Sequence, residues 1–482
     1  MDNYEFNLAE LKLQVNLDTI ISKQPIVVQK NKYVGRAVEV LKLLNIEERL
    51  LEIRSFNDGV IGKPYLHATG GDENHRFEYS EIAESINRKF PNKIGALYVH
   101  FPFCTKKCRF CHYYKDSSAS PQEWEAFPEN IVGELKLLSS LFQFKQIHAE
   151  SIHFGGGSPS LLSPDAWWRF IEGTRQYVNF DEALEIALEP DPEDVDRTRV
   201  NAWLESGINR VSLGVQSFDT GVLTYLRRGH TGVEAMEGIN LLMESGIPNV
   251  NVDMMYGMPN RSLQSWIDDL EVLKRYRPHS ATCYATRPDS RNILEKAHDF
   301  PSDMERIIAH QVSIEYMMGA GYFQYSPNQF ITGYQGACLA KNNRNRCKDV
   351  LGIGPRAHSI FQGWFYENFV GHDQYRKNIS SGMLCPIKGN HITPEEEKRR
   401  FLQFGLKLSG LNKSDDNNGV KIEDYNSRFD SCISTDFQST LDVLADIDLI
   451  EHKHNDSLTL THTGVLLSYD VGKYIDKSEI NA

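Results

Sequence analysis

Three cysteines lie close together in the segment Cys104–Cys111, with three residues between the first two and two residues between the last two. A [4Fe–4S] cube normally takes four thiolates, so three thiolates on one tight loop leave one iron open to chelate a small molecule. Zinc is the alternative, but zinc sites usually draw four ligands from paired Cys/His motifs. No second pair of matching spacing is present, although His112 is a conceivable fourth ligand. The spacing therefore favours an iron–sulfur cluster held by Cys104, Cys108 and Cys111.

A glycine run follows the next apolar stretch, in the segment Phe154-Gly155-Gly156-Gly157-Ser158-Pro159. Consecutive glycines let backbone amides approach a ligand and adopt positive φ, and the Ser158 hydroxyl adds another polar group. Alone, such a run is more often a simple turn. One strand–helix unit after the cysteine loop, it favours a cradle for the small molecule that the cluster chelates.

Short apolar runs alternate with amphipathic segments of helical length from Gly95 onward, which predicts strand–helix units and a parallel sheet. Ligands should then gather at the carboxyl ends of the strands. We expect an α/β fold: a partial (β/α)6 TIM-like barrel with an N-terminal extension and a C-terminal α+β domain that resembles a winged helix. The predicted domains are residues 1–93, 94–335 and 336–482. The predicted strands are Ala96–His100, Ser151–Phe154, Leu184–Leu188, Arg210–Gly214, Val250–Met254 and Ser280–Tyr284.

Composition narrows the class of protein. The chain carries 52 basic and 65 acidic residues, a formal charge of −13, which argues against a nucleic-acid-binding protein. We find no apolar run of about 18 residues and no secretory signal, so we expect a cytoplasmic location without membrane contact. Eight cysteines in 482 residues are too few for a disulfide scaffold. The five cysteines outside the loop have no metal-binding spacing: Cys283, Cys338, Cys347, Cys385 and Cys432.

Several further motifs make the chain similar to the oxygen-independent coproporphyrinogen III oxidase family of radical S-adenosylmethionine (SAM) enzymes. The resemblance covers about residues 94 to 470 and includes the Gly-rich turn near Gly352. It implies that the open iron binds SAM and that one electron from the cluster cleaves it to a 5′-deoxyadenosyl radical. The motifs are Tyr98–Cys104, Phe154–Ser160, Glu189–Pro192, Gly207–Phe218, Arg228–Thr231, Val252–Pro259 and Leu351–Ser359.

The resemblance also implies roles for single residues, because two SAM molecules sit together in that family. The SAM on the cluster would contact Tyr98, Gly156 and Glu189. Carboxylates suit the SAM amine and ribose hydroxyls, and an arginine suits the SAM carboxylate. Structural ion pairs are the alternative for the charged residues, and Gln216 could simply satisfy backbone groups. The second SAM would contact Phe110, Gly157, Ser158, Gln216, Arg228, Asp253 and Ala285.

The chain departs from the oxidases at two places. Tyr113 stands where they carry a fourth cysteine, and Lys341–Cys347 replaces an aromatic-glutamine stretch. The chain therefore has all the residues expected to contact two SAM molecules but lacks the oxidase-specific residues. This combination favours a methyltransferase-like or cyclopropane-forming enzyme acting on an sp² carbon of a small molecule. Its hypothetical base is Tyr98 or His358, and a hydrogen-bonded structural role is an equal alternative for His358.

Two alternatives for the function stay open. One is a coproporphyrinogen III dehydrogenase-like or other haem-modifying radical SAM enzyme, and the other is a haem-binding chaperone. Whether the protein is the methyltransferase-like enzyme or the dehydrogenase-like enzyme, we expect a reductant protein such as a flavodoxin or ferredoxin as its partner.

Overall fold

The computed structural model describes residues 16–56, 76–259, 261–286, 300–411, 413, 418–453, 456–478 and 480. The chain forms two compact units, each built from segments that are separated in the sequence. The cysteine unit contains Thr69–Val252 and Gln335–Glu396. The second unit contains Met1–Ala68, Asp253–Tyr334 and Glu397–Ala482. The domain boundaries at residues 93 and 335 stay a prediction.

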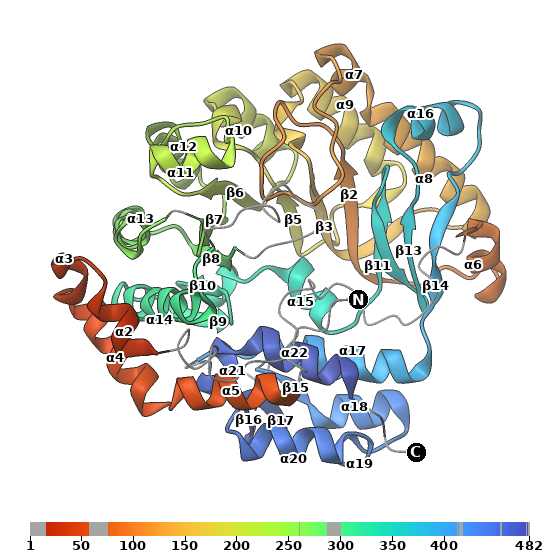
Figure 1. Ribbon diagram of the computed structural model, residues 1–482. Coiled ribbons are helices and arrows are strands. Elements are labelled where there is room, and N and C mark those ends of the chain that lie inside the picture. Colours follow the sequence, from red (N-terminus) through yellow and green to blue (C-terminus); the bar gives the residue numbers. More distant parts are fainter. Residues whose placement is uncertain are drawn as a thin grey trace, which may run out of the picture. The chain divides into compact units, whose positions relative to one another are not determined.

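The cysteine unit is built on a mixed sheet whose centre is parallel (Figure 1). Apolar runs that are buried along most of their length form the central strands, as expected for a parallel sheet covered on both faces. The parallel strands lie in the order β11 (Val350–Ile353), β2 (Ile94–Phe101), β3 (Ile147–Gly156), β5 (Glu185–Leu188) and β6 (Arg210–Gln216). Beyond β11 the sheet continues antiparallel through β12 (His358–Phe361), β13 (Trp364–Asn368), β14 (Ile387–His391) and β1 (Arg76–Phe77).

Helices connect the parallel strands, and their first residues follow familiar capping rules. Ser163 caps the helix that begins with Pro164, and Thr231 forms a capping box with Glu234. Trp167 in α9 and Trp203 in α10 are buried on the faces that their helices turn to the core. The helices are α6 (Tyr79–Ser85), α7 (Pro121–Ala126), α8 (Pro128–Phe142), α9 (Pro164–Arg175), α10 (Arg197–Glu205), α11 (Thr220–Leu226), α12 (Gly232–Glu244), α15 (Leu339–Asn345) and α16 (His372–Ser380).

The second unit contains an antiparallel strand group and most of the helices near the two ends of the chain. Strand β10 (Gln329–Ile331) pairs antiparallel with both β8 (Ser280–Ala285) and β9 (Phe323–Ser326). The predicted C-terminal wing is present as a three-stranded sheet in the order β15 (Val420–Lys421), β17 (Ser457–Leu460) and β16 (Ile450–Lys453). The helices of the second unit are α2 (Leu17–Ser22), α3 (Ile26–Gln29), α4 (Lys32–Leu43), α5 (Ile46–Phe56), α13 (Leu263–Tyr276), α14 (Asp303–Gly319), α17 (Pro394–Leu406), α18 (Ile422–Phe429), α19 (Ile433–Asp436), α20 (Gln438–Asp446), α21 (His462–Leu466) and α22 (Ser468–Lys477).

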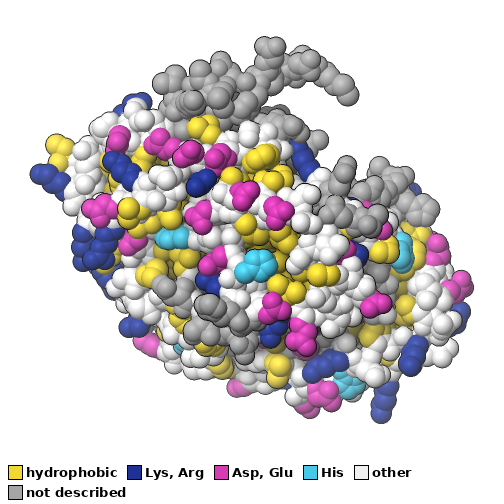
Figure 2. Space-filling model, turned by 90° about the horizontal axis from the view of Figure 1, so that it is seen from below, with side chains coloured by type: hydrophobic (Ala, Val, Ile, Leu, Met, Phe, Trp, Pro, Cys, Tyr) yellow, Lys and Arg dark blue, Asp and Glu magenta, His cyan; other side chains and the backbone are white. Residues whose placement is uncertain are grey.

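All six predicted strands are present, as β2, β3, β5, β6, β7 (Asn249–Tyr256) and β8, so the predicted α/β class is confirmed. Strand β7 crosses from the cysteine unit into the second unit. No helix among the described residues is long and apolar enough to cross a membrane. On the face that Figure 2 shows, acidic and basic side chains are interspersed rather than gathered by sign.

Candidate active site

The cysteine loop begins where β2 ends and is fixed by backbone hydrogen bonds. The Cys104 amide donates to the Asp116 carbonyl at 3.1 Å, and the Asp116 amide donates to the Pro102 carbonyl at 2.6 Å. On the other side of the loop, the Arg109 amide donates to the Leu226 carbonyl at 3.1 Å. The Cys108 side chain is buried, whereas the residues between it and Cys104 are exposed. The three thiols are therefore presented by a loop that is anchored at both ends.

Polar and cationic groups lie beside these thiols. Arg228 Nη1 lies 3.4 Å from Cys108 Sγ, and Ser158 Oγ lies 3.6 Å from Cys104 Sγ. Burial raises the pKa of the Cys104 thiol to about 12, so this thiol needs a positive partner such as iron to ionise at neutral pH. Burial alone would lower the pKa of Lys115, but the charges of Cys111 and Cys108 raise it overall. Three thiols with cations beside them fit a [4Fe–4S] cluster with one open iron.

The glycine run holds the cysteine loop against the sheet. The Gly157 amide donates to the Phe101 carbonyl at 2.6 Å, and the Ser158 amide donates to the Phe103 carbonyl at 2.7 Å. A Cβ on Gly157 would lie 2.3 Å from the Phe103 carbonyl oxygen, so no side chain fits there. Gly156 has φ of 101° and packs against the His100 ring. The Gly157 and Ser158 amides therefore form hydrogen bonds within the chain, and the contacts of the glycine run with SAM stay predictions.

Tyr98 and His100 form a hydrogen-bonded pair at the carboxyl end of β2. His100 Nε2 lies 3.0 Å from the Tyr114 carbonyl oxygen, so this nitrogen must carry the proton. His100 Nδ1 is then the acceptor for the Tyr98 hydroxyl, which lies 3.0 Å away. Burial lowers the pKa of His100 to about 4, and burial, followed by the charge of Glu189, raises that of Tyr98. At neutral pH this arrangement keeps the Tyr98 hydroxyl protonated and the imidazole neutral, which makes Tyr98 a weak base.

Glu189 is held by His153 from the neighbouring strand. His153 Nε2 lies 2.8 Å from Glu189 Oε1, and the Gly156 amide donates to Oε2 at 3.4 Å. Burial opposes the charge on both groups, but their mutual attraction raises the pKa of His153 and lowers that of Glu189. His153 is the register partner of Tyr98 across β2 and β3. Glu189 is therefore a fixed, ionised carboxylate, as an acceptor for the SAM amine requires.

A second ionic group links Asp191, Arg228 and Ser158. Arg228 Nη2 donates to Asp191 Oδ1 at 2.5 Å and also to the Gly214 carbonyl, and the Ser158 hydroxyl donates to Asp191 Oδ2. Gln216 ends β6 with φ of 71°, a conformation that non-glycine residues seldom adopt and that is common at functional sites. The structure thus brings the predicted Ser158, Gln216 and Arg228 to one end of the sheet.

Sequence reasoning missed four residues that support this site: His100, Lys115, His153 and Asp191. The alternation of side chains along a strand could have found His100, because Tyr98 and His100 must share a face of β2. Asp191 stands in one of the motifs that carry the family resemblance.

The remaining predicted residues lie in different surroundings. His358 begins β12 with a half-exposed ring. Its Nε2 lies 3.6 Å from Glu367 Oε2, and its charge is one of the causes, after burial, that lower the pKa of His100. Phe110 is half-buried in the cysteine loop, and Tyr113 is 56% exposed. Asp253 and Ala285 belong to the second unit, so their predicted contacts with SAM stay predictions.

Helix α15 contains most of the segment that departs from the oxidases, and it lies at the amino ends of the strands. Glu185, the first residue of β5, accepts hydrogen bonds from the Leu339 and Ala340 amides at 2.8 and 2.9 Å. Asn343 Nδ2 donates to the Gly95 carbonyl at the start of β2, at 2.8 Å. The cysteine loop follows the opposite, carboxyl end of β2.

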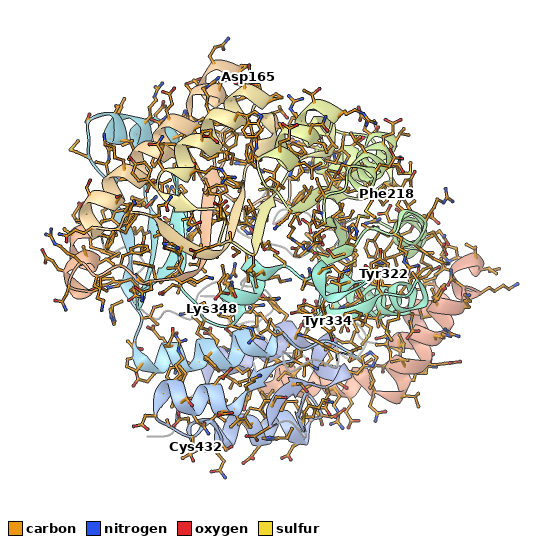
Figure 3. The ribbon with its side chains drawn as sticks, turned by 180° about the vertical axis from the view of Figure 1, so that it is seen from behind. Asp165, Phe218, Tyr322, Tyr334, Lys348 and Cys432 are labelled. Carbon is orange, nitrogen blue, oxygen red and sulfur yellow. The ribbon has the colours of Figure 1, made fainter. Side chains whose placement is uncertain are left out.

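Lys348, labelled in Figure 3, extends this attachment by an ion pair with Glu150 at 2.8 Å. Residues 341–347 therefore belong to a structural attachment at the end of the sheet away from the cysteines. Their departure from the family pattern does not remove groups from the candidate site.

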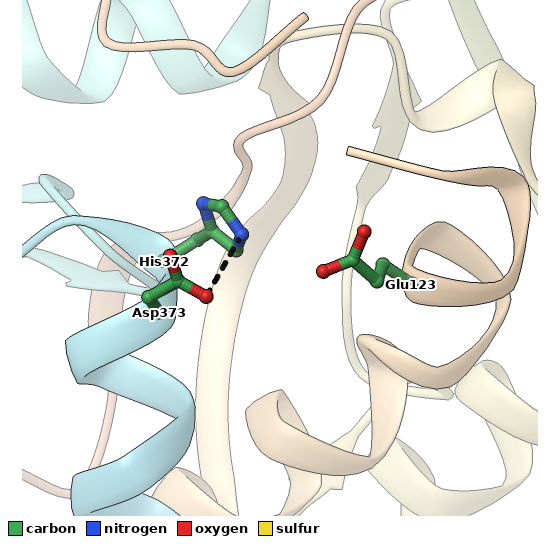
Figure 4. Close-up of side chains that lie close together, drawn as sticks. All are labelled: Glu123, His372 and Asp373. Atoms are coloured by element: carbon green, nitrogen blue, oxygen red, sulfur yellow. Dashed lines mark ion pairs between the residues drawn. The ribbon is translucent and has the colours of Figure 1, made fainter. Parts of the chain in front are cut away.

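Figure 4 shows a further group in the cysteine unit, formed by Glu123, His372 and Asp373, with one ligand atom from each within 4.8 Å of the others. Each carboxylate has a structural role: Glu123 completes a capping box with Ser120, and Asp373 lies in the first turn of α16. His372 Nδ1 lies 3.1 Å from Asp116 Oδ2, and Asp116 holds the cysteine loop. We interpret the group as a support of that loop.

A three-cysteine loop after the first strand of such a sheet, with a fixed carboxylate beside it, defines a radical SAM protein. The Radical SAM superfamily model matches residues 98–273. The heme chaperone HemW of Haemophilus influenzae is 29% identical over 269 residues, which are 55% of this chain and 69% of the relative. Anaerobic coproporphyrinogen III oxidase 1 of Cereibacter sphaeroides is 26% identical over 329 residues, 65% of this chain and 73% of the relative.

A solved structure is similar over most of the chain. The coproporphyrinogen III oxidase HemN from Escherichia coli, a radical SAM enzyme, matches with a TM-score of 0.69 and 21% identity, over 83% of this chain and 94% of the other. This match confirms the partial-barrel fold with a C-terminal domain. These comparisons support the recognition of the chain as similar to radical SAM proteins and, among them, to HemN-like, coproporphyrinogen oxidase-like proteins.

The predicted methyl transfer or cyclopropanation is wrong. The relatives are named as coproporphyrinogen oxidases and heme chaperones rather than methyltransferases. The prediction counted Tyr113 and residues 341–347 as losses of oxidase-specific residues, but α15, which contains most of that segment, lies at the other end of the sheet.

Proposed function

We propose that this protein is a radical SAM enzyme that acts on a tetrapyrrole, as in the coproporphyrinogen oxidase reaction. One hydrogen atom of a propionate side chain would pass to the 5′-deoxyadenosyl radical and give 5′-deoxyadenosine. The remaining substrate radical would lose carbon dioxide and give one electron to an electron acceptor, which leaves a vinyl group. The observation that carries the proposal is the likeness to the Cereibacter sphaeroides oxidase over 73% of that protein. A bound cluster and SAM would supply the carbon radical that removes the hydrogen.

The residues of the cysteine unit have distinct tasks in this proposal. Cys104, Cys108 and Cys111 hold the cluster, and Arg228 donates to the sulfur of Cys108. Glu189, fixed by His153, accepts the SAM amine. Such fixed polar groups orient a bound cofactor without reorganisation during the reaction.

Other contacts in the proposal rest on the family resemblance. Tyr98 packs beside the SAM on the cluster, with its proton committed to His100. A second SAM molecule is proposed from the resemblance alone, with Ser158, Gln216 and Arg228 as its contacts in the cysteine unit.

A haem chaperone is the second candidate, supported by the 29% identity to the HemW of Haemophilus influenzae. In that case the cluster-binding unit is retained, and haem is bound rather than changed. His358 is the candidate axial ligand, since its ring is half-exposed beside Glu367.

The test is an anaerobic reaction of the reconstituted, reduced protein with SAM and coproporphyrinogen III. We expect 5′-deoxyadenosine and carbon dioxide in amounts that rise together. A haem titration of the same preparation distinguishes the chaperone, because axial ligation by histidine gives a distinct absorption band that His358→Ala should abolish. Cleavage of SAM without carbon dioxide, and without a haem band, would contradict both candidates.

A further inference from the structure

Three cations surround one aromatic ring on the antiparallel part of the sheet in the cysteine unit. Strands β13 and β14 lie beyond β11 (Figure 1), and the half-buried Phe369 directly follows β13. The guanidinium groups of Arg356 and Arg76 lie 4.6 and 4.9 Å from the centre of the Phe369 ring, and Lys388 Nζ lies 5.0 Å from it. We call Arg76, Arg356 and Lys388 the Phe369 cation cluster.

This cluster contains more cations than carboxylates. Arg356 pairs with Glu367 at 2.8 Å. Arg76 and Lys388 lie directly opposite each other in the register of β1 and β14, and like charges at such positions destabilise a sheet. In the part of the chain that the structure describes, neither of these two cations forms an ion pair with a carboxylate. The cluster therefore has positive charge left to bind an anion, although the formal charge of the whole chain is −13.

The backbone holds Arg356 in an unusual conformation. Its φ is 60°, in the left-handed region that residues other than glycine seldom adopt and that is common at functional sites. The Arg356 amide donates to the Asn368 carbonyl at 2.8 Å, and 33% of the side chain stays exposed beside Glu367. A fixed, partly exposed guanidinium is well suited to bind a carboxylate through two parallel hydrogen bonds.

Tyr114 connects the cluster to the candidate active site. The Arg356 guanidinium lies 6.0 Å from the centre of the Tyr114 ring, and the Tyr114 carbonyl oxygen lies 3.0 Å from His100 Nε2, next to Tyr98. Along the sheet, β13 is three strands from β2, which is about 14 Å at the usual spacing. A tetrapyrrole with extended propionate side chains can span this distance.

We propose that the Phe369 cation cluster binds a carboxylate of a tetrapyrrole substrate and so holds one propionate while another lies at the reaction site. The inference rests on the proposed function and deepens it, because it assigns recognition of the substrate acid to named residues. Arg356 and Lys388 donate hydrogen bonds to the carboxylate, and the exposed Arg76 adds a third positive charge. The Phe369 ring offers an apolar surface to the carbon atoms beside the carboxylate.

The experiment uses coproporphyrin III, the stable oxidised form of coproporphyrinogen III, which carries the same propionates. Its binding to the reconstituted protein with SAM is measured by absorbance titration. Arg76→Gln with Lys388→Gln neutralises two cations of the cluster, whereas Arg76→Lys with Lys388→Arg keeps both charges. The control, Lys89→Gln with Lys93→Gln, removes two exposed cations before the start of β2. Iron content and the SAM dissociation constant are measured for every protein.

We expect the neutral cluster variant to bind coproporphyrin III about tenfold more weakly than the wild type, because hydrogen bonds between charged groups are lost. The control should bind like the wild type, and the charge-retaining variant should bind more tightly than the neutral one. Iron content and SAM binding should be the same in all four proteins.

Three results would overturn the carboxylate site. They are equal coproporphyrin III binding by the neutral cluster variant and the control, equal binding by the neutral and charge-retaining variants, and a weakening of SAM binding that matches the weakening of coproporphyrin III binding. The last result would assign the cluster to the carboxylate of SAM. A wild type that shows the expected binding differences but releases no carbon dioxide from coproporphyrinogen III would instead overturn the proposed reaction.

Discussion

The buried pair of Tyr98 and His100 makes a quantitative prediction for the dependence of stability on pH. His100 is 2% exposed, and burial lowers its pKa to about 4 from an ordinary value of 6.5. The unfolded chain therefore takes up a proton as pH falls below about 6.5, while the folded chain does not until about pH 4. Stability from this group is complete above pH 6.5 and is lost as the pH falls through that window.

The size of the effect follows from the two pKa values. A shift of one pKa unit corresponds to about 1.4 kcal/mol, so the full difference approaches about 3 kcal/mol. At pH 5 the unfolded imidazole is almost fully protonated and the folded one is mostly neutral. Linkage then gives a loss of about 2 kcal/mol between pH 7.5 and pH 5.

The perturbation is His100→Gln, which keeps a donor for the Tyr114 carbonyl but cannot titrate. The assay is urea unfolding of the metal-free chain at pH 7.5 and pH 5, followed by tryptophan fluorescence. Other groups change stability with pH in both proteins, so the informative quantity is the gap between wild type and variant. We expect the wild type to lose about 2 kcal/mol relative to the variant on moving to pH 5. A gap that is the same at both pH values would refute a buried, neutral His100.

Two further predictions concern β3 and the glycine run that continues beyond it. His153→Ala should weaken SAM binding about fivefold, since a hydrogen bond to a charged group is worth about 1.5 kcal/mol and partial exposure reduces it to about 1. His148 lies on the same strand and forms a similar pair with Glu182, so the matched change His148→Ala should leave the SAM dissociation constant unchanged in equilibrium dialysis. Gly157→Ala should lower iron content after reconstitution, because its Cβ would collide with a backbone oxygen. Gly35→Ala, in helix α4 with no atom within 4 Å, should raise stability by about 0.5–1 kcal/mol in urea unfolding without changing iron content.

Local sequence carries much of the fold and of the cluster site. The strands are apolar runs between turn residues, and the thiol spacing needs no tertiary information to suggest an iron–sulfur cluster. Pairing across strands is different, because the register of Tyr98 opposite His153 depends on how β2 and β3 align. Such partners are 55 residues apart in the chain and were not predicted.

The position of α15 was also beyond local sequence. Asn343 reaches the Gly95 carbonyl 248 residues away, and nothing in the polar segment around it indicates which end of the sheet it covers. The family resemblance counted residues 341–347 among the places where oxidase-specific residues are missing. Gly352 lies within β11, and the turn at Gly354 follows that strand. Because β11 runs parallel to β2, a segment before β11 lies at the amino ends.

The same sheet topology separates residues that hold the cysteine loop from residues that only support the sheet. At the carboxyl ends of β2 and β3, the backbone oxygens of Phe101 and Phe103 accept from the glycine run, so a change at Gly157 displaces the cysteine loop directly. At the amino ends, Glu185 and Gly95 anchor α15 through groups that only support the sheet. Substitutions in α15 should therefore change the free energy of unfolding and leave iron binding intact once the protein is folded. A departure from a family pattern has to be placed on the sheet before it is counted as evidence about the reaction.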